Sequence, residues 1–177
     1  GFGALSPFAF IHPNPDLSTL DQLIEDAQCS QAVYVTQIQD TDLSHSLPLS
    51  TLIKDCWQLD EIVERYQRFI AHFEPVLAHL QQTPILDAEQ AFVPRPLLIH
   101  EFRRAQLHDP QLPLALLPKN WIGKQAYELC QQLYRYLAQP SQTHILATLR
   151  TEDPDAPDAA PYFYERFGGL KIEEMTS

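Results

Sequence analysis

A helical rhythm of apolar side chains fills the stretch from Leu59 to Leu80. Apolar residues recur three or four positions apart over about six turns, a spacing that places them on one face of an α-helix. Such a long stripe is normally buried, so the middle of the chain is expected to be helical. Pro75 lies inside the run and is predicted to kink the helix or divide it after His72, because its ring clashes with the preceding turn and it has no N–H to donate.

Further helical patterns lie on both sides of this run. Asp87 can cap a helix, with Gln90 three residues on, and this helix is expected to continue to His108. Pro94 and Pro96 should make its first half irregular. The other segments with helical spacing are 49–57, 121–137 and 142–149. Together they predict a mainly α-helical domain over residues 47–150.

The first 46 residues have a different pattern. Residues 4–12 indicate a short strand, and a helix capped by Asp16 or Ser18 follows. The β-branched run in 30–39 favours a second strand. A strand–helix–strand order with only about 20 residues between the strands suits a small ferredoxin-like sheet, which normally has four strands. Residues 1–46 are therefore expected to be an incomplete domain of this type, and the fold class is α+β.

The composition changes again after residue 150. Residues 151–161 are rich in Asp, Ala and Pro and hold too little apolar surface to order themselves, so they are predicted to form a mobile acidic loop. Residues 162–177 recover aromatic character at Tyr162, Phe163 and Tyr164. This aromatic tail is expected to dock back on the body of the protein.

The net charge of −11 is spread unevenly along the chain. Residues 1–56 hold seven acids and one lysine, residues 57–150 hold nine acids and nine bases, and residues 151–177 hold seven acids and two bases. Duplex DNA repels acidic surfaces, so this chain alone is expected to be a poor DNA binder. An anionic small molecule would instead be drawn to the middle segment, although mixed charges of this kind also occur on helices that are merely solvated.

Several classes of protein are disfavoured. Cys29, Cys56 and Cys130 are odd in number and widely spaced, so reduced thiols in a cytoplasmic protein are expected rather than a zinc site or a disulfide framework. No apolar run approaches the roughly 20 residues that span a bilayer, and no signal-peptide pattern opens the chain. Because Gly1 stands where a Met is usual, the chain is expected to be a fragment or a processed product.

Catalytic signatures are also missing from the sequence. His100-Glu101 followed by Arg103-Arg104 is reminiscent of the zinc motif HExxH, but Arg104 stands where the second His is required, and a guanidinium does not ligate zinc. The chain holds no GxSxG, no GxxxxGK[ST] and no GxGxxG motif. We therefore expect no metal, no cofactor and no catalytic residue, and the protein is not predicted to be an enzyme.

A binding site is the remaining interpretation. Guanidinium groups suit phosphates through bidentate hydrogen bonds, and aromatic rings suit an apolar or aromatic acyl group, so a site of both kinds would hold an acyl-CoA. The same residues also fit solvated helix surface plus core aromatics, and the pattern alone does not separate the two. The candidate ligand-binding residues are Arg95, His100, Arg103, Arg104, Lys119 and Trp121.

Long segments of the chain resemble the PaaX family, the repressors of phenylacetate-degradation operons. The similarity extends essentially from residue 1 to residue 173. A departure is that Pro94 and Pro96 stand where family members often continue a helix. The matching segments are GFGALSP at 1–7, CW at 56–57, AFVPRPLLIHEFRR at 91–104, DPQLPLALLPKNWIGKQAYELCQQLYRYL at 109–137 and YFYERFGGLKIE at 162–173.

The resemblance implies an architecture and a function. Family members have an N-terminal winged helix, a middle domain similar to the Cas2 ferredoxin-like fold, and a helical C-terminal domain. This chain would lack the winged helix and the first strand of the middle domain. The resemblance also implies a homodimer that leaves operator DNA when it binds phenylacetyl-CoA. Two alternatives are a purely structural oligomerisation module and an enzyme that processes acyl-CoA or retains a Cas2-like nuclease activity.

Overall fold

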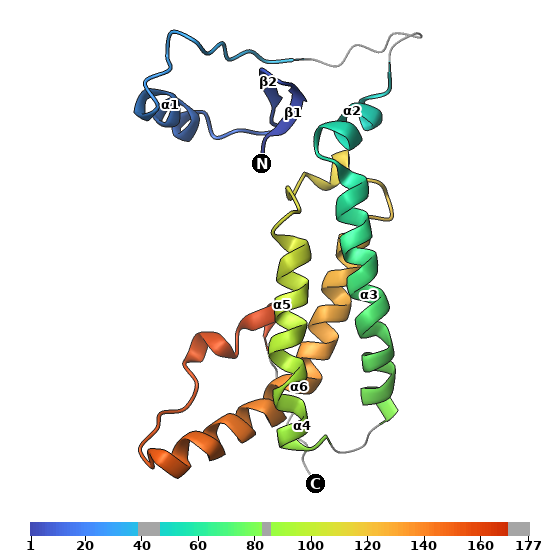
Figure 1. Ribbon diagram of the computed structural model, residues 1–177, viewed down its shortest axis with the longest axis vertical. Coiled ribbons are helices and arrows are strands. Elements are labelled where there is room, and N and C mark those ends of the chain that lie inside the picture. The colour runs from blue at the N-terminus through green and yellow to red at the C-terminus, as the bar shows by residue number, and fades with distance from the viewer. Residues whose placement is uncertain (39–46, 83–85, 170–177) are drawn as a thin grey trace. The chain divides into compact units, whose positions relative to one another are not determined.

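The computed structural model describes residues 1–38, 47–82 and 86–169 (Figure 1). The chain divides into two compact units. The N-terminal unit comprises Gly1–Glu61 and Asp109–Asn120, and the helical unit comprises Ile62–His108 and Trp121–Ser177. The fold class of the described residues is α+β, as predicted, with helices that far outnumber the strands.

The N-terminal unit begins with a β-hairpin. Strands β1 (Gly3–Ser6) and β2 (Ala9–Ile11) pair antiparallel, with Gly3 opposite Ile11. Helix α1 (Leu17–Asp26) follows, and the Asp16 carboxylate caps it by accepting a hydrogen bond from the Ser18 backbone N–H at 3.0 Å. The sequence left Asp16 and Ser18 as alternative caps, and Asp16 fills the role.

The second strand predicted within residues 30–39 is wrong for residues 30–38, where the structure has no strand; residue 39 lies outside the described residues. The β-branched side chains that favoured it, Val35 and Ile38, are 59% and 68% exposed. A strand needs a partner for its backbone groups, and in the described residues β1 pairs with β2 instead. The ferredoxin-like arrangement therefore stays a prediction.

Helix α2 (Leu49–Cys56) supplies the core of the N-terminal unit and covers almost the predicted range. Ile53 and Cys56 are buried, and the Trp57 indole that follows donates a hydrogen bond to the Gly1 carbonyl at 3.0 Å. A Cβ at Gly3 would lie only 2.7 Å from the Trp57 ring. Glycine is therefore required where the hairpin meets this ring.

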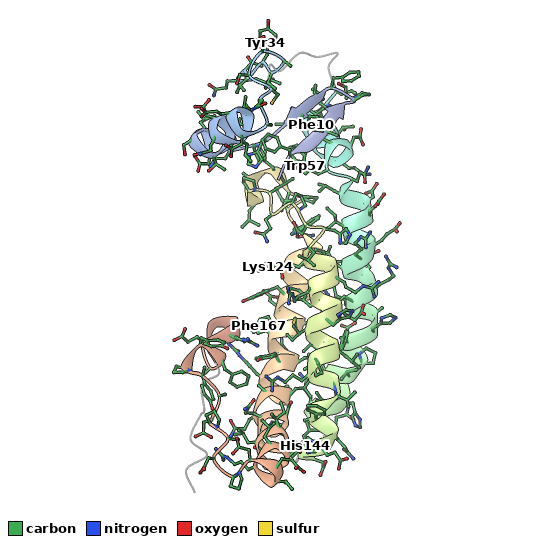
Figure 2. All side chains as sticks on the ribbon, turned by 60° about the vertical axis from the view of Figure 1, so that its left-hand side comes forward. Phe10, Tyr34, Trp57, Lys124, His144 and Phe167 are labelled. Atoms are coloured by element: carbon green, nitrogen blue, oxygen red, sulfur yellow. The ribbon has the colours of Figure 1, made fainter. Side chains whose placement is uncertain are left out.

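Three long helices form the helical unit. Helices α3 (Leu59–Gln82), α5 (Pro94–Gln106) and α6 (Ile122–Glu152) lie side by side, and the short α4 (Ala88–Phe92) packs against α6 (Figures 1 and 2). Among the described helices, none has the length and apolar character required to cross a membrane.

Aromatic rings join α3 to α5. The Phe102 ring centroid lies 5.5 Å from that of Phe69 and 6.5 Å from that of Tyr66. Such edge-to-face and tilted pairs add to the free energy gained by burial. Leu98 of α5 and Leu133 of α6 have no exposed surface. The stripe predicted from Leu59 to Leu80 is thus the buried face of a real helix.

Prolines break the helices less than the sequence predicts. Pro75 does not divide α3, and the two helices expected at 121–137 and 142–149 are one helix with Pro140 inside it. Pro75 has no N–H to donate to the Ala71 carbonyl, four residues earlier in the helix. Both residues are exposed, so this carbonyl faces water. The irregularity predicted for the first half of the helix over 87–108 is confirmed, since the helix is interrupted at Val93 and Pro94 starts α5. In Figure 1 the last turns of α6 run at an angle to the first ones.

Beyond α6 the chain turns back along the helical unit (Figure 1). We call residues 153–169 the returning segment. Arg150 holds its start, since the guanidinium donates to the Ala156 carbonyl at 3.2 Å and to the Asp158 carboxylate at 2.8 Å. Two single 3₁₀ turns follow, Pro161–Phe163 and Arg166–Gly168. These contacts place aromatic side chains of the segment against α5 and α6.

Candidate ligand-binding cleft

A cleft of about 520 Å³ lies on the helical unit between α5, α6 and the returning segment. Its volume falls in the range of roughly 300–1,000 Å³ that small-molecule sites occupy. The walls combine guanidinium groups with an apolar surface. The apolar part is formed by Phe92, Pro96, Ile99, Leu107 and Ile145.

The helical period of α5 explains why one side of it faces the cleft. Residues 95, 99 and 103 follow one another at intervals of four, which places them on one face of a helix. The neighbouring side of α5 carries Leu98 and Phe102, which are buried in the core. Pro94 is the first residue of the helix, a position whose N–H has no hydrogen-bond acceptor within the helix, so a proline is tolerated there. The segment LLIHEFRR therefore puts Leu98 into the core and its arginines at the cleft.

Arg95 is the most constrained cation of the cleft. Its Nη1 donates to Ser141 Oγ at 3.3 Å and to Gln142 Oε1 at 3.4 Å. The guanidinium carbon lies 4.7 Å from the ring centroid of Phe163 and 5.7 Å from that of Tyr134. Both rings attract the cation through their π faces. Arg95 is thus positioned by neutral partners and keeps its charge unneutralised.

The other arginines of the cleft are more exposed. Arg104 forms an ion pair with Glu101 at 3.1 Å, but its side chain is 64% exposed, so solvent screens the pair. Arg166 lies within 6 Å of the Tyr162 and Phe163 ring centroids. No ion pair involves Arg103 or Arg166 among the described residues, and none of the side chains that line the cleft is acidic. The cleft is therefore a site of positive potential in an acidic protein.

Tyr134 forms part of the wall that α6 contributes. Its side chain is 0% exposed, and its hydroxyl has no hydrogen-bond partner among the described residues. The Phe167 ring from the returning segment lies against it, with the two ring centroids 4.9 Å apart (Figure 2 labels Phe167). The Phe167 carbonyl accepts a hydrogen bond from Gln131 Nε2 at 2.7 Å. Buried polar groups are seldom left without a partner, so this hydroxyl is unusual.

The structure brings four of the six candidate binding residues to this cleft. Arg95, Arg103 and Arg104 line it together with His100. Trp121 is half-buried, and its ring packs edge-on against Tyr66 with 6.3 Å between the centroids, outside the cleft. The sixth residue, lysine 119, is exposed and belongs to the N-terminal unit.

Eight of the twelve lining residues were not singled out as binding residues from the sequence, and three of these eight have polar side chains. Tyr134 lies on the apolar stripe of the helix predicted at 121–137, a position typical of a core residue. Ser141 follows Pro140, where the sequence predicted a break between helices. Arg166 lies in the aromatic tail, far from the other arginines along the chain. An isolated arginine in a tail carries no signal of a site that only tertiary structure assembles.

The structure also bears on metal and thiol chemistry. In the described part of the chain, no three His, Cys, Asp or Glu side chains gather closely enough to hold a metal ion. All three cysteines are free thiols, and Cys130 has no exposed surface. Burial raises the pKa of the Cys130 thiol to about 12, which keeps it protonated and therefore unreactive near neutral pH.

Comparison with known proteins places these elements in a family. Residues 57–147 match the model of the PaaX-like protein C-terminal domain. The chain is also 33% identical over 175 residues to the transcriptional repressor PaaX of Escherichia coli strain K12. This alignment covers 98% of the chain and 55% of the relative, so the chain spans about half the length of that protein. The relative is a repressor and not an enzyme. The chain belongs to the PaaX-like C-terminal domain family.

Proposed function

We propose that the chain is the effector-binding and dimerising part of a PaaX-type transcriptional repressor of phenylacetate catabolism. In this proposal phenylacetyl-CoA binds the cleft between α5, α6 and the returning segment, and its binding releases the full-length repressor from operator DNA. The observation that carries the proposal is the set of four arginines around one partly apolar cleft. The family relationship supports the regulatory role.

The chemistry of the cleft fits the two ends of an aryl-acyl-CoA. The phosphates of CoA are anions that guanidinium groups bind through paired hydrogen bonds, and Arg103 and Arg104 are exposed enough to reach them. The phenyl ring needs an apolar wall, which Phe92 and Ile145 provide. Arg103 and Arg104 would thus hold the charged end, while the ring lies on the apolar side.

Titration calorimetry with phenylacetyl-CoA tests this assignment. We expect the double variant Arg103→Ala, Arg104→Ala to bind at least tenfold more weakly than the unchanged chain, because two charge-assisted contacts are lost. Arg135→Ala is the matched control, since Arg135 is an exposed arginine of α6 that does not line the cleft. An absence of heat together with an absence of thermal stabilisation by any acyl-CoA would refute the proposal.

DNA binding is assigned to a part of the protein outside this chain. A net charge of −11 repels duplex DNA, so the operator would be contacted by a winged-helix domain of the full-length repressor. Such a repressor acts on chromosomal DNA, which places the protein in the cytoplasm. The expected signature is operator binding by the full-length protein that phenylacetyl-CoA abolishes, with no binding by this chain alone.

A second candidate function, a pure oligomerisation module, is favoured by apolar side chains on the N-terminal unit. Phe8 is 96% exposed, Phe10 is 61% exposed and Tyr34 is 98% exposed. Large aromatic side chains are enriched in the surfaces through which proteins bind one another. We infer a homodimer formed through a Cas2-like ferredoxin domain to which this unit contributes. Sedimentation tests this second candidate: a dimer indifferent to CoA esters supports it, and a monomer rejects it.

A further inference from the structure

The hydroxyl of Tyr134 is buried and has no hydrogen-bond partner among the described residues. A phenol carries one O–H donor and accepts hydrogen bonds at the same oxygen. Leaving it buried without a partner is unfavourable, and the cost disappears if a polar atom is supplied. The Tyr134 side chain has no exposed surface and lines the cleft, and no described residue satisfies its hydroxyl.

The neighbours of Tyr134 indicate which kind of atom fits. Arg95 lies 5.7 Å from the Tyr134 ring centroid and carries only donors, so it offers nothing for the hydroxyl to donate to. The second neighbour of the Tyr134 ring is the ring of Phe167, which is apolar and offers no hydrogen-bond acceptor. A group that accepts hydrogen bonds and carries partial negative charge is therefore favoured, both by the Tyr134 O–H and by the field of Arg95. A carbonyl oxygen has these properties.

The returning segment provides the way in. Phe167 has φ 54° and ψ 36°, the left-handed region that a bulky residue rarely adopts. Its ring packs on Tyr134, and Gln131 holds its carbonyl. Such a conformation persists only while the surrounding contacts hold it, so a ligand that replaces these contacts would relieve the strain. The acyl end of a ligand would replace the Phe167 ring against Tyr134.

We infer that Tyr134 is the specificity-determining residue of the cleft, and that its hydroxyl donates a hydrogen bond to the thioester carbonyl oxygen of the bound acyl-CoA. The ligand class rests on the proposed function; the role of Tyr134 rests on its burial, its unpaired hydroxyl and its neighbours. Arg103 and Arg104 then select the CoA phosphates, and Tyr134 selects an acyl thioester over other CoA derivatives.

The test compares two ligands on two proteins by calorimetry. The ligands are phenylacetyl-CoA and S-(2-phenylethyl)-CoA, a thioether in which a CH₂ group replaces the carbonyl. The proteins are the unchanged chain and Tyr134→Phe. We expect the unchanged chain to bind the thioester about tenfold more tightly than the thioether, because only the thioester pairs the hydroxyl. Tyr134→Phe should bind both ligands equally, at the affinity of the thioether.

The thermal midpoint of ligand-free Tyr134→Phe is a second readout. A purely structural role of the hydroxyl would lower this midpoint, whereas the inference predicts no fall. Removing an unpaired buried hydroxyl should leave the midpoint unchanged or raise it. A fall of several degrees would mean that the hydroxyl already has a partner, and would overturn the inference. A thioester preference that survives in Tyr134→Phe would overturn it as well. Failure of both ligands to bind the unchanged chain would instead reject the proposed function, and the inference with it.

Discussion

Replacing Arg95 with Ala is the perturbation for which the structure gives the clearest magnitude. Arg95 donates to Ser141 at 3.3 Å and to Gln142 at 3.4 Å, and it lies over the Phe163 ring at 4.7 Å. Ser141 is 0% exposed, and its hydroxyl accepts the hydrogen bond from Arg95. The substitution therefore removes a cation–π contact and leaves a buried hydroxyl to find another acceptor or donor.

The individual contributions add up to a measurable loss of stability. The cation–π contact with Phe163 contributes about 0.5–2 kcal/mol when it is partly desolvated. The hydrogen bonds of Arg95 are long, so together with the unpaired Ser141 we assign them about 1–2 kcal/mol. The expected loss is about 2–3 kcal/mol in the free energy of unfolding. For a chain of this size it lowers the thermal midpoint by about 5–10 °C.

Thermal denaturation followed by far-UV circular dichroism measures this shift. Arg103→Ala is the matched control, because Arg103 lines the same cleft but is exposed and has no ion pair among the described residues. Its midpoint should change by less than about 2 °C. In a double-mutant cycle, Arg95→Ala should cost less when Ser141 is already Ala. Equal midpoints for the Arg95 and Arg103 variants would refute the role assigned to Arg95.

Three other predictions concern the N-terminal unit, the core and helix α1. Gly3→Ala should destabilise the N-terminal unit by about 1–3 kcal/mol, because the new Cβ overlaps the Trp57 ring, and urea denaturation followed by Trp fluorescence would detect it. Burial raises the pKa of the Cys130 thiol to about 12, so Cys130 should resist thiol reagents at pH 8 until the protein unfolds. Rapid labelling of Cys130 in the native protein, detected by mass spectrometry, would contradict its burial. Hydrogen bonds from the Ser18 and Thr19 side chains lower the pKa of Asp16 from 3.8 to about 2. A lowered pKa means that the cap stabilises α1 fully above pH 4 and that this contribution is lost as the pH falls through about 2, so NMR amide shifts of α1 should stay helical at pH 3.

Local chemistry made several elements predictable from the sequence. The caps at Asp16 and Asp87 depend on a carboxylate next to free backbone N–H groups, a relation that lies within three residues of the chain. The apolar stripe of α3 is equally local. The cations and aromatic residues clustered between residues 95 and 121 were proposed as a binding site, and four of the twelve residues that line the cleft came from that proposal.

Tertiary context decided the elements that the sequence missed. A β-branched run favours a strand only where another strand lies beside it, and the described residues provide none for Val35 or Ile38. Proline breaks a helix unless the carbonyl four residues earlier finds another hydrogen-bond partner. Pro75 and Ala71 are exposed, so water can bind the Ala71 carbonyl. The remaining cleft residues come from α6 and the returning segment, whose approach to α5 no local pattern encodes.

Hydrogen–deuterium exchange with and without phenylacetyl-CoA tests most directly whether the cleft between α5, α6 and the returning segment is the effector site. Saturating ligand should slow amide exchange in residues 94–106, with little change in residues 1–38. The same protection should be lost in the double variant Arg103→Ala, Arg104→Ala at equal ligand concentration. Protection confined to residues 1–38, or unchanged exchange throughout a chain that binds the ligand by calorimetry, would contradict this assignment.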